Sequence, residues 1–175
     1  MSEIGLYMSH NENPLGPSPI ALKAVMDQCH TMNLYPEPHA HSLKKRLALH
    51  LDIPASQIFV SAGSVEALDI LIRNFIQKKE HLIIPKVTFV AYKLLAKVFN
   101  ISVRYTAMNG FAIDVNDIIA NCDQTTKMII LANPNNPTGM MITHLELLKI
   151  LDYVDKKTWV VVDEAYCEYV ADTNY

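Results

Sequence analysis

Five short apolar runs, most of them rich in β-branched residues, alternate with segments of helical periodicity, and this alternation most constrains the fold. The runs lie near residues 58–60, 82–84, 102–106, 128–131 and 159–162. Continuous apolar runs of this length are typical of strands that are covered on both faces. The pattern therefore predicts an α/β protein, a three-layer sandwich with a mainly parallel sheet.

Local signals place the helices between these strands. Thr143 and Glu146 form a capping box, in which each side chain satisfies a free backbone N–H of a helix that runs through Tyr153. Ser64 is expected to cap a helix that ends near Phe75 and has Val65, Leu68, Ile72 and Phe75 on one face. Further helices are predicted at about 89–99, after Asp114, and at about 41–51.

The first part of the chain has a different pattern. Residues 11–19 contain three prolines and a glycine, which predicts an extended arm. Ser18 and Pro19 then provide an N-cap and a first helical position. We expect two parts: residues 1–34, an arm and first helix, and residues 35–175, the first part of a larger domain that is incomplete in this chain.

Composition excludes several classes of function. The 175 residues carry a net charge of -3, so no basic field favours nucleic acid or anionic lipid as a partner. No apolar run approaches the roughly 20 residues that span a bilayer, and the start lacks the features of a signal peptide. We expect a cytoplasmic protein. His39 and His41 lack a third ligand at a recognisable spacing, so no metal site is expected.

Two positions suit a ligand at the ends of predicted strands. The turn from Ser61 to Ser64 leads into a helix, whose free N–H groups and positive dipole end suit a phosphate. A serine after a glycine is also an ordinary N-cap. Phe89 follows the strand that ends near Pro85, where an aromatic face is available for stacking. Core packing is the simpler interpretation of Phe89.

The most distinctive motifs are an Asn-Pro loop at 133–139, Asn-Pro-Asn-Asn-Pro-Thr-Gly, and the sequence Asp-Glu-Ala-Tyr at 163–166. Asp163 ends an apolar strand, so its carboxylate is partly desolvated and needs a cation or hydrogen-bond donors. A strand-end cap and a tight turn are the simpler interpretations of these two motifs.

Together these segments resemble fold-type I, aspartate-aminotransferase-like enzymes that use pyridoxal phosphate, and most closely the histidinol-phosphate aminotransferase branch. The resemblance also covers Asn-Glu-Asn-Pro-Leu-Gly at 11–16, Leu-Tyr-Pro-Glu-Pro at 34–38 and the segment 57–68. It extends over nearly the whole chain. It implies an aspartate-aminotransferase-like large domain, of which this chain contains the N-terminal part.

The resemblance also assigns roles to individual residues. The backbone at Gly63, Ser64 and Val65 would hold the cofactor phosphate, and Phe89 would stack on the ring. Asn136 and Tyr166 would bind the phenolic oxygen of the ring, and Asp163 would pair with the ring nitrogen. Tyr35 would reach the cofactor of a neighbouring subunit, which implies a homodimer, while Asn13 and Leu15 would lie near the substrate.

The chain departs from the family pattern in two respects. Ala62 and Val65 stand where the family commonly has asparagine and aspartate. The lysine that carries the cofactor, the arginine that follows it and a carboxylate-binding arginine belong after Tyr175 in such enzymes. We interpret the four lysines Lys86, Lys93, Lys127 and Lys149 as surface residues.

The resemblance implies transamination of histidinol phosphate or an aromatic amino acid with 2-oxoglutarate, performed by a full-length parent enzyme. A decarboxylase or lyase of the same fold, similar to the threonine-phosphate decarboxylases, is an alternative. A truncated fragment without catalytic activity is another. The chain of 175 residues alone is expected to be inactive.

Overall fold

The computed structural model describes residues 9–175, in two compact units that meet between Phe59 and Val60. The first unit contains two helices, α1 (Pro19–Gln28) and α2 (His41–Leu51), and three short 3-10 helices at Cys29–Thr31, Pro38–Ala40 and Ala55–Gln57. Ser18 caps α1 by accepting a hydrogen bond from the N–H of Ala21, and Pro19 follows it, as predicted.

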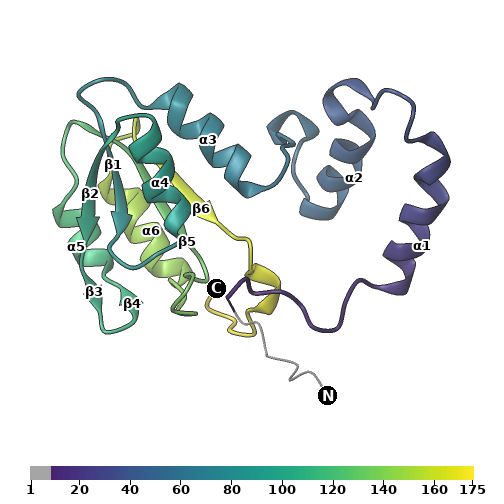
Figure 1. Ribbon diagram of the computed structural model, residues 1–175. Helices are drawn as coiled ribbons and strands as arrows, with labels where there is room; N and C mark the ends of the chain where they lie inside the picture. The colour runs from purple at the N-terminus through teal and green to yellow at the C-terminus, as the bar shows by residue number, and fades with distance from the viewer. Residues whose placement is uncertain (1–8) are drawn as a thin grey trace, which may run out of the picture. The chain divides into compact units, whose positions relative to one another are not determined.

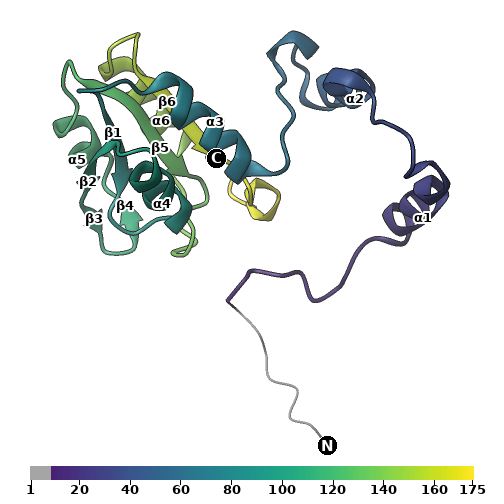
Figure 2. The same ribbon diagram turned by 45° about the horizontal axis from the view of Figure 1, so that its top comes forward.

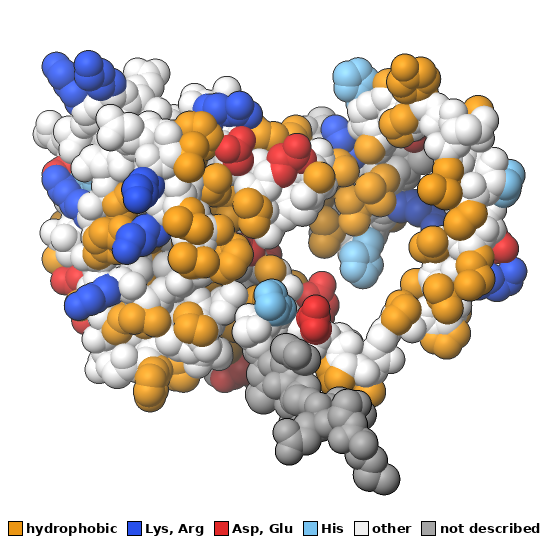
Figure 3. All heavy atoms as spheres, viewed as in Figure 1, with side chains coloured by type: hydrophobic (Ala, Val, Ile, Leu, Met, Phe, Trp, Pro, Cys, Tyr) orange, Lys and Arg blue, Asp and Glu red, His pale blue; other side chains and the backbone are white. Residues whose placement is uncertain are grey.

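Neither α1 nor α2 has a buried residue. Large hydrophobic side chains on α1 are exposed, among them Ile20 at 83% and Val25 at 64%. Figure 3 shows hydrophobic side chains, in orange, on the surface of this helix. Isolated helices of 10 or 11 residues are marginally stable, because most helical stability in proteins comes from packing.

The second unit is an α/β sandwich around a four-stranded parallel sheet, which has the order β2-β1-β5-β6 (Figure 1). The strands are β1 (His81–Pro85), β2 (Ser102–Thr106), β5 (Thr126–Ala132) and β6 (Trp159–Asp163). A small antiparallel pair, β3 (Met108–Asn109) with β4 (Ala112–Ile113), lies between β2 and α5 in the sequence. Four of the five predicted strands are therefore confirmed.

Four α-helices cover the sheet: α3 (Ser64–Phe75), α4 (Val90–Val98), α5 (Val115–Ala120) and α6 (His144–Tyr153). Leu82 and Ile84 of β1 pack in one core cluster with residues of α3 and α4, whereas Ile83 packs in a second cluster with residues of α5 and α6. Successive strand side chains point to opposite faces, so the sheet lies between two helical layers (Figure 2). The predicted three-layer sandwich is confirmed.

The predicted strand at residues 58–60 is wrong for this chain. Ile58 has extended backbone angles, with φ at -103° and ψ at 124°, yet the segment belongs to neither sheet of the described residues. Phe59 is 64% exposed. An extended segment becomes a strand only when another strand satisfies its N–H and C=O groups, and none of residues 9–175 supplies such a partner for 58–60.

The cap of α3 also differs from the prediction. Gly63, and not Ser64, is the N-cap, and its φ of +90° lies in the region that glycine adopts without strain. Ser64 is the first residue of the helix, and the carboxylate of Glu66 accepts a hydrogen bond from the N–H of Ala62. The capping box of Thr143 with Glu146 is confirmed, as are the helices after Asp114 and at 90–98.

Candidate functional site

A small pocket lies at the carboxyl ends of β5 and β6, beside the starts of α3 and α4. Its lining residues are Ser64, Phe89, Tyr92, Ala132, Pro134, Asn136, Asp163, Ala165 and Tyr166. Carboxyl ends of parallel strands meet at one edge of a sheet, where open α/β proteins bind ligands. Five of the predicted site residues therefore line one pocket: Ser64, Phe89, Asn136, Asp163 and Tyr166.

Asp163 is the last residue of β6, and protein donors hold both of its carboxylate oxygens. The Tyr92 hydroxyl donates to Oδ2 at 2.8 Å, and the N–H of Ala165 donates to Oδ1 at 3.2 Å. The backbone carbonyl of Asp163 accepts a hydrogen bond from the N–H of Asn133 at 2.9 Å. The carboxylate is thus oriented before any ligand binds.

Tyr92 is a site residue that the sequence analysis did not assign. Its side chain is fully buried on α4, and its hydroxyl donates a hydrogen bond to Asp163. Burial, and then the negative charge of Asp163, raise the pKa of the Tyr92 hydroxyl well above its usual value. The hydroxyl therefore remains a neutral donor. A buried tyrosine hydroxyl usually finds a partner, but the sequence did not indicate which residue this would be.

Phe89 lies at the N-cap of α4 and serves both core and pocket. Its ring meets the ring of Tyr92 edge to face, with centroids 5.6 Å apart and an interplanar angle of 90°. It also packs against the core cluster of α3 and α4. The simpler interpretation of Phe89, core packing, is thus also correct. The part of the ring that the core does not cover lines the pocket.

The Asn-Pro loop is held by two buried amide side chains. Asn133 and Asn135 are 6% and 2% exposed. The Asn135 side chain accepts from the Thr88 hydroxyl at 2.9 Å and donates to the carbonyl of Val87 at 3.0 Å. This ties the loop to the segment that leads into α4. Asn136, the residue directly before Pro137, instead lines the pocket.

The start of α3 offers backbone donors at the edge of this pocket. The first N–H groups of any α-helix lack an intrahelical acceptor, and they lie at the positive end of the helix dipole. In α3 these groups belong to Ser64 and its successors, and Ser64 lines the pocket. Val65 is 45% exposed and does not line the pocket. The carboxylate of Glu66 already accepts a hydrogen bond from the N–H of Ala62. The backbone N–H groups that could donate to a ligand therefore begin at Gly63.

Three predicted residues lie in the first unit, and their roles stay predictions. Asn13 shapes a turn, since its carbonyl accepts from the N–H of Gly16 and its side chain accepts from the N–H of Leu15. Leu15 is 90% exposed and Tyr35 is fully exposed. Exposed apolar and aromatic side chains on an extended segment are suited to contact with another surface.

No lysine lines the Asp163 pocket in the described part of the chain. Lys93 lies 6.0 Å from the centroid of the Tyr105 ring, Lys127 is 3.9 Å from Glu80, and Lys149 donates to Asn116 at 2.6 Å. Among residues 9–175 we find no group of three or more potential metal ligands, and none of their helices is long and apolar enough to cross a membrane.

A sequence model of the family aminotransferase class I and II matches residues 3–174. The chain belongs to this family. It is 40% identical over 164 residues to a histidinol-phosphate aminotransferase of Anaeromyxobacter sp., covering 93% of this chain and 45% of that protein. It is 36% identical over 169 residues to histidinol-phosphate aminotransferase 2 of Legionella pneumophila (strain Paris), covering 95% of this chain and 46% of that protein.

Solved structures of the family share the fold. The histidinol-phosphate aminotransferase of Clostridium acetobutylicum is 28% identical, with a TM-score of 0.82 over 94% of this chain and 48% of its own. The enzyme of Sinorhizobium meliloti, solved with pyridoxal 5'-phosphate, has a TM-score of 0.86 at 23% identity. The chain spans about half the length of the relatives it matches. The prediction of an aspartate-aminotransferase-like fold, of which this chain contains only a part, is therefore confirmed.

Pyridoxal phosphate is the cofactor of this aminotransferase family, and the residues of the pocket fit it. An oriented carboxylate, an aromatic ring, a side-chain amide and a helix start converge there, which are groups that suit a pyridine ring and a phosphate. The pocket volume is only about 70 Å³, whereas ligand pockets usually measure about 300–1,000 Å³. The pocket that the described residues form is therefore smaller than a usual ligand pocket.

Proposed function

We propose that this chain is the N-terminal part of a pyridoxal-phosphate-dependent aminotransferase, which acts on histidinol phosphate or an aromatic amino acid with 2-oxoglutarate. The observation that carries the proposal is the position of Asp163. It ends a core strand, has both carboxylate oxygens oriented by donors, and shares a pocket with Phe89, Asn136 and Tyr166. The names of the relatives support the substrate class.

When bound, pyridoxal phosphate supplies an electron-poor ring that accepts an electron pair from the substrate Cα. Asp163 holds a proton on the ring nitrogen by charge pairing and so keeps the ring electron-poor. Asn136 and Tyr166 bind the phenolic oxygen, and Phe89 packs on the ring face. The amides of Gly63, Ser64 and Val65 bind the phosphate at the start of α3, as the helix dipole favours.

The proposed working form is a cytoplasmic homodimer in which the first unit contributes to the sites. Tyr35 would reach the partner subunit's cofactor, and Asn13 and Leu15 would lie near the substrate. The full exposure of Tyr35 and the exposed apolar side chains of α1 support an additional contact surface for residues 1–34. Residues 35–175 would then begin the cofactor-binding domain.

The experiment that tests the proposal replaces Asp163 by alanine in the complete enzyme. Loss of the carboxylate should lower kcat by about a hundredfold or more, a typical cost for removing an electrostatic group from an active site. Pyridoxal phosphate should still bind through its phosphate. Asp152→Ala, which removes an exposed aspartate from α6, is the matched control. Normal turnover by Asp163→Ala would overturn the assigned role.

A second reaction remains as the alternative, a decarboxylase or lyase on the same fold. A threonine-phosphate decarboxylase of Porphyromonas gingivalis shares the fold at 22% identity with a TM-score of 0.68. Assays with histidinol phosphate, phenylalanine and threonine phosphate distinguish the two reactions. Glutamate formed from 2-oxoglutarate supports transamination, whereas release of carbon dioxide supports decarboxylation. Cofactor binding with neither product supports a chain without catalytic activity.

A further inference from the structure

Tyr92 connects the two residues that would contact the cofactor ring in the proposed function. Its hydroxyl donates to Oδ2 of Asp163 at 2.8 Å, and the edge-to-face contact of its ring with Phe89 brings the centroids to 5.6 Å. Asp163 comes 71 residues later in the sequence. One fully buried side chain thus touches both the carboxylate and the stacking ring.

The geometry points to Tyr92 as a positioning residue that fixes the orientation of the Asp163 carboxylate towards the cofactor ring. This inference rests on the proposed function, because it concerns the same site. A hydrogen bond from a buried donor fixes the direction in which a carboxylate oxygen points. The direction from which Asp163 meets a ring nitrogen therefore depends on the Tyr92 hydroxyl.

The rest of the pocket explains why this bond is strong. Tyr92 is 0% exposed, so water does not compete for its hydroxyl, and the low local dielectric strengthens the bond. Among residues 9–175, the second donor to the carboxylate is the N–H of Ala165, at the longer distance of 3.2 Å. Because that N–H approaches Oδ1, Oδ2 is oriented by the Tyr92 hydroxyl.

Tyr92→Phe in the complete enzyme isolates this bond, because it removes the hydroxyl and keeps the ring against Phe89. We expect kcat to fall about tenfold to a hundredfold, the range that corresponds to one hydrogen bond to a charged group. KM for the amino donor should change less than kcat, since the bond does not contact the substrate. Tyr153→Phe on α6, where the side chain is 61% exposed, is the matched control.

A spectroscopic readout separates positioning from a purely structural role. The enzyme is loaded with pyridoxal phosphate labelled with ¹⁵N in the ring, and the ¹⁵N chemical shift reports how closely the proton is held by the ring nitrogen. Without the hydroxyl the carboxylate is free to turn away from the ring nitrogen, so in Tyr92→Phe the shift should move towards the unprotonated value. Tyr153→Phe should leave it unchanged.

A second variant keeps the hydroxyl. A ring-fluorinated tyrosine at position 92 retains the donor to Oδ2, so the ¹⁵N shift should stay close to that of the unmodified enzyme. An unchanged shift in Tyr92→Phe, with a changed shift in Asp163→Ala, would overturn the role of Tyr92 and leave the proposed function intact. An unchanged shift in Asp163→Ala would instead count against the proposed function itself.

Discussion

The side chain of Asn133 holds the backbone of Ile142 by two hydrogen bonds. Its Nδ2 donates to the Ile142 carbonyl at 3.0 Å, and its Oδ1 accepts from the Ile142 N–H at 2.8 Å. Both residues are buried. The side-chain amide of Asn133 thus pairs with Ile142 as a backbone peptide group would. The two bonds close the loop that contains Asn136.

We predict that Asn133→Ala destabilises this loop and weakens cofactor binding. The substitution leaves the N–H and the C=O of Ile142 buried without partners, at a cost of about 1–3 kcal/mol for each group. Urea unfolding and a titration with pyridoxal phosphate measure the two effects in the complete enzyme. Asn116→Ala, an exposed asparagine on α5, serves as the control. Equal stability of the two variants would contradict the role of Asn133.

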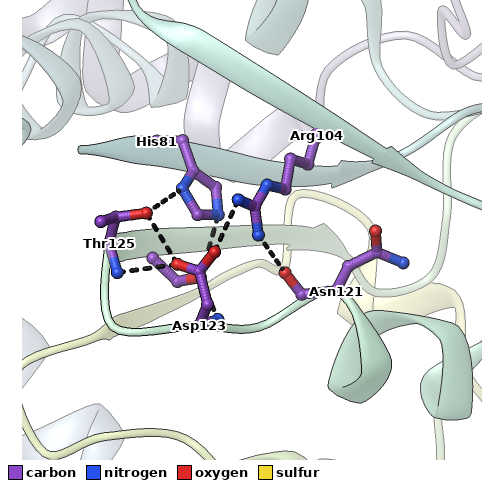
Figure 4. A network of polar contacts seen from close by, with 6 residues as sticks. His81, Arg104, Asn121, Asp123 and Thr125 are labelled. Carbon is purple, nitrogen blue, oxygen red and sulfur yellow. Dashed lines mark hydrogen bonds and ion pairs between the residues drawn. The ribbon is translucent and has the colours of Figure 1, made fainter. Parts of the chain in front are cut away.

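A second polar network lies at the opposite, amino-terminal end of the strands, where His81 is 4% exposed (Figure 4). The Thr125 hydroxyl donates to Asp123, so it accepts from Nδ1 of His81. Thr126 accepts the N–H of Asp123, and its hydroxyl lies 2.9 Å from Nε2. With a neutral imidazole, the Thr126 hydroxyl donates to Nε2 and each of these donors has an acceptor. Arg104 forms an ion pair with Asp123, in which Nη2 lies 2.6 Å from Oδ2.

We predict that this network makes the protein less stable in mild acid. Burial, followed by the charge of Arg104, lowers the pKa of His81 in the folded state, and Asp123 opposes this only in part. The unfolded chain therefore binds a proton as the pH falls through about 6.5, while the folded chain does not, so stability decreases.

Urea midpoints measured between about pH 5 and 7.5 test this dependence. His81→Gln should reduce the slope of stability against pH, whereas His144→Gln, at an exposed position on α6, should not. If His81→Gln retains the slope of the unmodified protein, the loss of stability in acid arises from other groups.

For Tyr35 we predict complementation between subunits. Tyr35→Ala and Asp163→Ala should each be nearly inactive as homodimers of the complete enzyme. In a mixed dimer, one site would combine an intact Asp163 with the partner's intact tyrosine, so activity should return. Verified heterodimers that show no recovery would argue against a Tyr35 that crosses to the partner.

The chain of residues 1–175, expressed alone, should not transaminate. No described lysine lines the Asp163 pocket, and the extended segment 58–60 pairs with no strand in the described part of the chain. The cofactor lysine is needed as the group that binds the cofactor and moves the Cα proton. Borohydride reduction followed by peptide mapping, with an assay on histidinol phosphate, tests this. A specific adduct on one lysine together with turnover would mean that the nucleophile lies within this chain.

The sequence by itself determined the elements that depend on neighbouring residues. Ser18, Asp114 and Thr143 cap helices as their patterns predict, because a cap satisfies N–H groups only two or three residues away. The apolar runs of the central strands β1 and β5 were equally recognisable, because strands covered on both faces need continuous apolar residues. The motifs around Asn136 and Asp163 indicated the family because each is a short run of consecutive residues.

Only the tertiary structure decided the features that depend on distant residues. The strand order β2-β1-β5-β6 and the unpaired segment 58–60 depend on which strands are present to pair. The contact of Tyr92 with Asp163, and that of Thr88 with Asn135, join residues 71 and 47 positions apart. A sequence pattern shows that a buried hydroxyl or amide needs a partner, but packing of helix against sheet selects which partner lies within 3 Å.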